Sequence, residues 1–460
     1  MIQAESKVEV RILVPSGMLG SGFPASIVDR GLELGADVIA VDGGSTDSGP
    51  HYLGTGTAKT TAAAVKRDLR ILLRAAATAR IPLIVGSCGT SGTDSGVDWV
   101  FSIASSLLDE EGLALRIARI YSEQPAADLK ERLDRIHPLA PHGDLDPSTL
   151  ESCEHIVAMM GHEPIADALA TGADVVLAGR ATDTAVAAAF PLMHGMPAGP
   201  TWHAAKIVEC GAQCTTNPRS SGVFATIDAT GFTIEPLSDG VACTPHSVAA
   251  HMLYETVNPF SMREPAGTLQ VADAVYTALD DRRVRVEGSR FELAEQYTNK
   301  LEGSRITGYE TMSFTAIRDP HILGQLDTWA ALLRRILTER VSQTLSLGPD
   351  DYAFDIRLYG HNAVLGALEE ATAPPREVGV MLLVSAPDQP TATAIAKIAN
   401  PLMLHLPTPD MDYLPSLAFP FSPAETERGA AYEFVLNHVV DVDSPTALFR
   451  TVMLEAGDVR

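Results

Sequence analysis

The feature that most constrains this fold is a short apolar run that ends abruptly in a loop of small and polar residues. It stands at 34–50, where a β-branched run at 38–41 leads into the loop Asp42-Gly43-Gly44-Ser45-Thr46-Asp47. Such runs predict buried strands of an open α/β sheet, and these sheets bind ligands in the loops beyond the carboxyl ends of their strands. The same construction recurs at 82–94 and 173–184. Three such loops predict one shared cleft.

Helical patterns lie between these strands and extend the alternation. From 61 to 79 apolar residues recur at helical spacing, with basic residues on the opposite face. Further strands are expected at 8–14, 114–120 and 155–160, and further helices at 25–34, 97–111, 125–135 and 164–171. Strands that alternate with helices favour parallel pairing through right-handed crossovers. We therefore predict an α/β fold, with a mostly parallel sheet and covering helices over about 8–215.

The pattern changes after Pro200. Strand patterns dominate about 220–320, which predicts a β-rich middle section closed by a helix at 322–345. The last hundred residues contain strand patterns at 352–360, 378–386 and 432–440 and a helical pattern at 388–403. We expect these to form a small ferredoxin-like α+β domain. The predicted domains are a core over 1–345 and a C-terminal domain over 350–460.

Charge and cysteine content narrow the range of partners. The formal net charge is −24, and a basic face is needed to hold phosphates, so neither nucleic acid nor an anionic membrane is expected as a partner. The five cysteines are odd in number and mostly far apart, which favours a reducing compartment. No run is long and apolar enough to span a membrane. We expect a cytoplasmic protein that forms a homo-oligomer.

Common cofactor and hydrolase motifs are missing from the sequence. Gly17, Gly20 and Gly22 follow the first strand, but their spacing is not G-x-G-x-x-G. No P-loop, G-x-S-x-G or H-E-x-x-H motif occurs. Cys210 and Cys214 lack a second cysteine pair, so a structural zinc is not expected. We expect no nucleotide cofactor and assign no metal ligand, although a divalent metal is compatible with the chemistry.

Four residues are candidates for catalysis. Asp42 directly follows a buried strand and can act as a general base. Cys88 stands in a loop of small polar residues, where it is either a nucleophile with a lowered pKa or a small packing residue. Asp94, in the same loop, is a candidate proton carrier. His203 is either an acid–base group or a packing residue of a half-buried helix.

Arg180 is the candidate for binding a substrate carboxylate. Its guanidinium can form two parallel hydrogen bonds, and the neighbouring small residues leave room for a ligand. The alternative is an internal ion pair with Asp183 or Asp42. Further substrate contacts are expected from Ser45, Thr46, Asp47, Thr182, Asp183 and Lys206.

Distinctive strings are spread over the whole chain. They are VPSGMLGSGFP, DVIAVDGGSTDSGPHYLG, AGRATDTAVAAAFPL, WHAAKIVECGAQC, CTPHSVAAHMLYE, FPFSP and FVLNHVVDVDSPTALFR. These strings resemble the family named for acyclic terpene utilisation, the AtuA-type family. The resemblance implies a large α/β core followed by a small ferredoxin-like domain. It also implies a catabolic enzyme for terpenes, branched acids or other small carboxylates, as free acids or acyl-CoA esters, without assigning catalytic residues.

Three functions remain open. The first is a lyase of the hydratase type, or an isomerase, in which Asp42 or His203 moves a proton next to a carbonyl and amides of the 86–94 loop stabilise the enolate. The second is a hydrolase that uses Cys88. The third is a non-catalytic scaffold subunit of a carboxylase-type complex. Three polar loops at one sheet edge favour an enzyme that acts on a small carboxylate or acyl-CoA substrate.

Overall fold

The computed structural model describes residues 8–141, 143–370 and 373–454, which divide into two compact units. The first unit extends to Arg305 and resumes at Phe434, and the second is Ile306–Glu433. Two long strands, β15 (Thr298–Ile317) and β18 (Glu425–Asp441), carry the chain between the units. The boundary expected near 345–350 therefore lies inside the second unit.

Five parallel strands form the centre of a ten-stranded sheet in the first unit, in the order β1-β2-β3-β7-β4. They are β1 (Glu9–Val14), β2 (Val38–Asp42), β3 (Leu83–Gly86), β7 (Val175–Ala178) and β4 (Ile117–Tyr121). Most of their residues are buried, because helices cover both faces of the sheet. The predicted α/β class, with a parallel sheet and covering helices, is confirmed.

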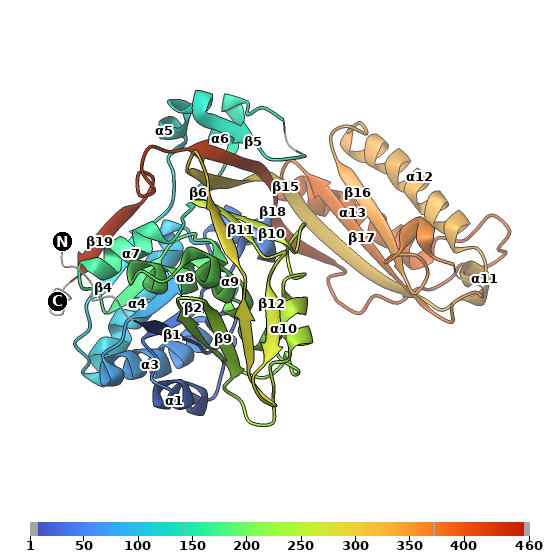
Figure 1. Cartoon of the computed structure of the whole chain (residues 1–460). Helices are drawn as coiled ribbons and strands as arrows, with labels where there is room; N and C mark the ends of the chain where they lie inside the picture. Colours follow the sequence, from blue (N-terminus) through green and yellow to red (C-terminus); the bar gives the residue numbers. More distant parts are fainter. Residues whose placement is uncertain (1–7, 142, 371–372, 455–460) are drawn as a thin grey trace. The chain divides into compact units, whose positions relative to one another are not determined.

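Alternate strand residues enter two separate cores. Along β2, Val38 and Ala40 belong to one core, whereas Ile39 and Val41 belong to the other. The first core is covered by α7 (Glu163–Ala170), α8 (Asp183–Met193) and α9 (Ala198–Val208), and the second by α1 (Ala25–Glu33), α3 (Ala62–Ala79) and α4 (Asp94–Glu111) (Figure 1). Continuous apolar runs are the sequence pattern that this arrangement requires.

Antiparallel strands extend the sheet on both sides. Beside β1 the order is β8, β9, β13, β12, and beside β4 lies β19. Their bounds are β8 (Val223–Asp228), β9 (Gly231–Pro236), β13 (Val284–Glu287), β12 (Val275–Ala278) and β19 (Arg450–Leu454). Four of the eight described strands of the β-rich middle section, β8, β9, β12 and β13, thus belong to the same sheet as the parallel strands.

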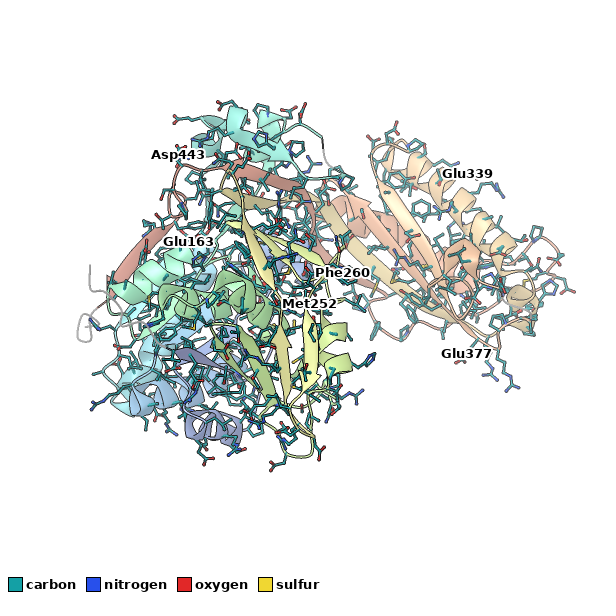
Figure 2. All side chains as sticks on the ribbon, in the orientation of Figure 1. Glu163, Met252, Phe260, Glu339, Glu377 and Asp443 are labelled. Carbon is teal, nitrogen blue, oxygen red and sulfur yellow. The ribbon has the colours of Figure 1, made fainter. Side chains whose placement is uncertain are left out.

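Smaller elements complete the first unit. A three-stranded sheet contains β10 (Ser261–Glu264), β11 (Gly267–Gln270) and β14 (Arg290–Leu293). The remaining helices and strands are α2 (Pro50–Thr55), α5 (Ala126–Lys130), α6 (Pro147–Ser152), α10 (Pro245–His251), β5 (Ile136–Pro138) and β6 (His155–Met159). Met252, directly after α10, is buried in the core that α7, α8 and α9 cover, and its position is labelled in Figure 2.

The second unit has its own apolar core between helices and an antiparallel sheet. Between β15 and β18 it contains α11 (Pro320–Leu323), α12 (Leu326–Leu345), β16 (Ala353–Tyr359), β17 (Val378–Ala386) and α13 (Gln389–His405). Apart from the short α11, the element order is β-α-β-β-α-β, with strands ordered β16-β17-β15-β18. Trp329 of α12 is fully buried and donates a hydrogen bond to the Leu406 carbonyl at 3.0 Å. In the described part of the chain, every helix is too short or too polar to cross a bilayer.

Candidate functional site

The loops that follow β2, β3 and β7 meet at one edge of the parallel sheet. Asp42 ends β2 beside the last residue of β3, and the Cys88 N–H donates to the Ala178 carbonyl of β7 at 3.0 Å. Gly92 shows how closely the loops approach, because its φ is +69° and an added Cβ would lie 2.1 Å from the Arg180 nitrogen. The prediction that Asp42, Cys88 and Arg180 stand at one sheet edge is confirmed.

A cavity of about 650 Å³ opens beside this edge. Its walls come from the loops after β1 and β2, the first residue of α8, and segments within 210–221 and 254–255. A cavity of this size can hold a small organic substrate. Its charged lining residues are Asp42, Asp47, Asp183, Glu255, Lys59 and Arg219.

Asp42 lines the cavity although only 8 % of its surface is exposed. One carboxylate oxygen accepts a hydrogen bond from the Gly43 N–H at 2.9 Å. Burial and the charge of Asp183 raise the pKa of Asp42 well above its ordinary value, against the opposing charge of Arg180. A carboxyl group in this setting can exchange a proton with a bound substrate.

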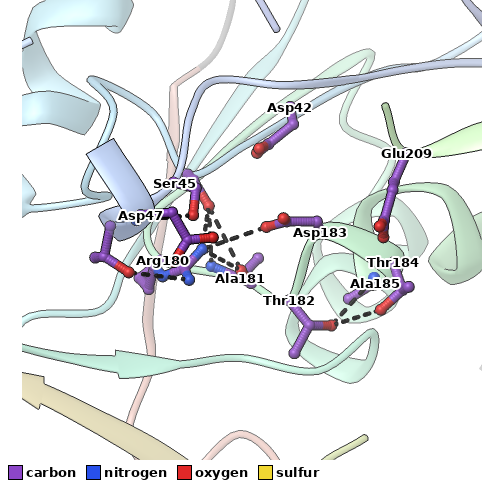
Figure 3. Close-up of polar contacts among 12 residues, drawn as sticks. Asp42, Ser45, Asp47, Arg180, Ala181, Thr182, Asp183, Thr184, Ala185 and Glu209 are labelled. Atoms are coloured by element: carbon purple, nitrogen blue, oxygen red, sulfur yellow. Dashed lines mark hydrogen bonds and ion pairs between the residues drawn. The ribbon is translucent and has the colours of Figure 1, made fainter. Parts of the chain in front are cut away.

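Arg180 is buried behind the cavity wall. Its Nε donates to Glu302 Oε2 at 3.0 Å, and its Nη2 donates to Thr46 Oγ1 at 3.3 Å. Its Nη1 donates to the Ala181 carbonyl at 3.0 Å and lies 3.4 Å from Asp183 Oδ1 (Figure 3). The structure therefore places Arg180 in an internal ion pair, the alternative that the sequence left open. From this position it holds the β2 and β7 loops together.

Asp183 is the residue of the β7 loop that reaches the cavity. It begins α8, and Thr182 caps that helix by accepting a hydrogen bond from the Ala185 N–H at 3.2 Å. The Thr182 hydroxyl also donates to Glu264 at 3.0 Å, so it has a structural partner. Burial raises the pKa of Asp183, although the charge of Arg180 opposes this rise. Two carboxyl groups, the buried Asp42 and the half-buried Asp183, thus line one cavity.

The predicted residues of the β2 loop have two different roles: some line the cavity and one supports a buried ion pair. Ser45 and Asp47 line the cavity, and the Asp47 N–H donates to Ser45 Oγ at 3.2 Å. Thr46, between them, is buried and donates its hydroxyl to Glu302 at 3.0 Å. Thr46 therefore supports the ion pair of Arg180, while its neighbours remain available to a ligand.

Cys88 is fully buried in the core beneath α3 and α4. Burial and the charge of Asp42 raise the pKa of its thiol, which opposes formation of the nucleophilic thiolate. Cys88→Ala is therefore expected to keep most of the turnover and to lose no more than about 1–2 kcal/mol of unfolding free energy. Steady-state kinetics and urea denaturation measure both quantities. A folded alanine variant without turnover, beside a Cys88→Ser variant with a trace, would restore the hydrolase hypothesis.

His203 is fully buried on α9 with partners on both ring nitrogens. Nδ1 lies 2.7 Å from Ser289 Oγ, and Nε2 lies 3.1 Å from the Tyr276 hydroxyl. Burial lowers the pKa of His203 to about 3. The structure thus places His203 among packing residues, away from the cavity lining.

Lys206 and Asp94 also have internal partners. Lys206, one turn after His203, forms a buried ion pair with Glu209, with 2.5 Å between Nζ and Oε1. Asp94, at the start of α4, accepts a hydrogen bond from the Glu123 N–H at 3.2 Å. Neither residue lines the cavity described above.

Three residues next to the cavity had no predicted role as a group. They are Glu209, Cys210 and His251, and one carboxylate oxygen, the thiol sulfur and one ring nitrogen lie within 4.8 Å of one another. These are ligand types of transition-metal sites. The adjacency of Glu209 and Cys210 is visible in the sequence, but His251 belongs to a distant helix that only the fold brings near.

Comparison with known proteins gives one match. The family model described as acyclic terpene utilisation family protein AtuA matches residues 56–413, well over half of the chain. No curated protein and no solved structure matches the chain. The matched segment contains Asp183, Cys210 and His251, whereas Asp42 precedes it.

Proposed function

The chain belongs to the acyclic terpene utilisation family AtuA, and from this premise we propose that it is a catabolic enzyme that works by proton transfer. The proposed reaction is that of a hydratase-type lyase or an isomerase. The proposed substrate is a small carboxylic acid or its acyl-CoA ester. Its reacting carbon lies next to a carbonyl group, where removal of a proton produces an enolate.

The observation that carries this proposal is the setting of Asp42. It is a buried carboxyl group on the wall of a cavity, at the carboxyl end of a parallel strand. Open α/β sheets bind ligands at this edge, and general acid–base groups need a pKa displaced toward the working pH. The raised pKa of Asp42 is a displacement in that direction.

In the proposed step, Asp42 removes the proton from the carbon next to the carbonyl. The electron pair of that C–H bond forms a new double bond to the carbonyl carbon, and the π pair of the carbonyl group moves to its oxygen, which becomes the enolate oxygen. Return of this proton from Asp42 to the γ-carbon of a β,γ-unsaturated substrate completes an isomerisation. Its transfer to a β-hydroxyl group, which then leaves as water, completes a dehydration. Small residues of the wall, such as Gly17 and Gly44, let main-chain N–H groups approach that oxygen.

Two basic residues of the lining support binding of an anionic substrate. Lys59 and Arg219 are exposed and line the same cavity as the buried Asp42 and the half-buried Asp183. A carboxylate or the phosphates of an acyl-CoA can pair with these cations, while the reacting carbon lies near the acids. Arg180, which is fully engaged inside the protein, supports this arrangement by fixing the position of Asp183.

Deuterium exchange tests the proposal before the substrate is known. We expect the purified chain in D₂O to incorporate deuterium next to the carbonyl of at least one member of a panel of unsaturated acids and acyl-CoA esters. Mass spectrometry measures the incorporation, and heat-denatured protein is the control for spontaneous exchange. If neither exchange nor turnover occurs with either substrate class, the proposal is wrong and a scaffold role becomes the better account.

A further inference from the structure

Glu209, Cys210 and His251 form a compact group beside the cavity. Glu209 and Cys210 follow the end of α9, His251 ends α10, and their ligand atoms lie within 4.8 Å of one another. Around a tetrahedral zinc ion the ligand atoms are roughly 3.5 Å apart, given bond lengths of about 2.0–2.3 Å. Side-chain movements on the order of 1 Å would close the group around such an ion.

His251 gives independent evidence that this group has a ligand. Its side chain is 5 % exposed, and its Nε2 is buried without a hydrogen-bond partner among the described residues. The ring also forms a hydrogen bond with the main chain of Lys206, which leaves Nδ1 as the atom involved. Metal-binding histidines use one nitrogen in this way and thereby direct the lone pair of the other to the metal. A buried ring nitrogen without a partner is otherwise destabilising.

Glu209 can supply an oxygen ligand, and further carboxyl groups lie around it. Glu209 is buried and pairs with Lys206 through Oε1, which leaves its second carboxylate oxygen for another ligand. Asp183 lines the adjoining cavity wall, and Figure 3 shows Asp42, Asp183 and Glu209 in one view of the site. Lys206 pairs with Glu209, and Arg180 lies 3.4 Å from Asp183, so both of these carboxylates already have a cationic neighbour. A divalent ion bound here would offset the charge of the Cys210 thiolate that it creates.

Backbone packing fixes Cys210 at the cavity. Gly211 has a φ of +60°, and an added Cβ would lie 2.8 Å from the Gly17 nitrogen in the loop after β1. An added Cβ on Gly17 would lie 2.9 Å from the Cys210 carbonyl carbon. The two glycines thus let the segments touch, and Cys210 becomes part of the cavity lining. A metal ion held there would have one side toward the cavity.

We propose that Glu209, Cys210 and His251 bind one divalent transition-metal ion of the zinc type at the wall of the cavity. Three protein ligands with a fourth, open position are typical of catalytic rather than structural zinc sites. The mixed O, S and N ligand set favours zinc or cobalt over magnesium and calcium, which prefer oxygen alone. The inference goes beyond the proposed function, and metal binding can be measured without any substrate.

The test uses the full chain, first stripped with a chelator and then loaded with Zn²⁺ or Co²⁺. We expect one ion per chain by elemental analysis and, with Co²⁺, the absorption band of a cobalt–thiolate bond. Cys210→Ser and His251→Gln should each weaken binding at least about tenfold. His246→Gln is the matched control, because His246 is exposed on the same helix, and Cys153→Ser controls for loss of a thiol elsewhere.

The cobalt spectrum keeps the test decisive if a ligand variant does not fold, because it reports on the wild-type chain. Absence of a thiolate band in the cobalt-loaded wild type overturns the proposal. So does binding that the Cys210 and His251 variants retain at wild-type strength. Loss of metal binding in these variants but not in the His246 and Cys153 controls supports the proposed metal site. This outcome does not depend on activity toward acyl substrates.

Discussion

Asp42→Asn is expected to lower kcat by about a hundred- to ten-thousand-fold, the range that general acid–base catalysis contributes. Asparagine keeps the shape of the side chain and can still contact the Gly43 N–H, but it cannot take up or release a proton. Because the lost interaction belongs to the transition state, KM should change little. Steady-state kinetics with a substrate found by deuterium exchange measure both parameters.

Stability separates a catalytic role of Asp42 from a structural one. Its raised pKa means that folding disfavours the charged carboxylate, so a neutral asparagine should leave the unfolding free energy at pH 7 unchanged or higher. Asp109→Asn, an exposed substitution on α4, is the matched control and should change neither rate nor stability. A folded Asp42→Asn variant with wild-type kcat would remove Asp42 from the mechanism.

The parallel sheet could be predicted because its signals are local. Runs such as 38–41 and 83–85 are apolar on both faces, and the helices between them carry regular apolar stripes. The meeting of the strand-end loops followed from the handedness of crossovers. The sequence did not predict that the β-rich section extends the parallel sheet. This extension depends on antiparallel pairing of β8 with β1, far away in sequence, and of β9 with β8. Strand β6 likewise pairs with β15, far away in sequence.

The candidate site was only partly predictable. Partners that lie far away in sequence decide which of its residues line the cavity and which form internal contacts. Asp42, Ser45, Asp47 and Asp183 line the cavity as a loop pattern suggests. Arg180 instead has Glu302 as partner, and a carboxylate on β15 has no signature in the sequence around Arg180. Similarly, Cys88 looks accessible in a loop of Gly, Ser and Thr, yet the loop folds inward and buries it. Loop composition predicts a site's location better than the direction of its side chains.

The buried ion pair of Arg180 leads to the second large expected effect. Glu302→Gln should lower the unfolding free energy at pH 7 by about 3 kcal/mol, because it leaves the guanidinium buried without its main countercharge. Glu302 accepts hydrogen bonds from Arg180 and Thr46 through one oxygen and from Lys300 at 2.7 Å through the other. Glutamine keeps this shape without the charge. Urea denaturation followed by circular dichroism measures the difference.

The pH dependence of that difference identifies the ion pair as its cause. Burial alone raises the pKa of Glu302, but the charges of Arg180 and Lys300 outweigh it and lower the pKa from 4.5 to about 2. A carboxylate with a lowered folded-state pKa stabilises the fold fully above about pH 4.5, and this stabilisation is lost as the pH falls toward 2. The difference in unfolding free energy between wild type and Glu302→Gln should therefore be constant from pH 7 to 5 and shrink below pH 4.5.

Glu110→Gln, which removes an exposed carboxylate paired with Arg70, is the control and should change the unfolding free energy much less at every pH. An equal effect of both substitutions, or a gap that persists at pH 2, would show that the charge of Glu302 does not stabilise the wall of the cavity.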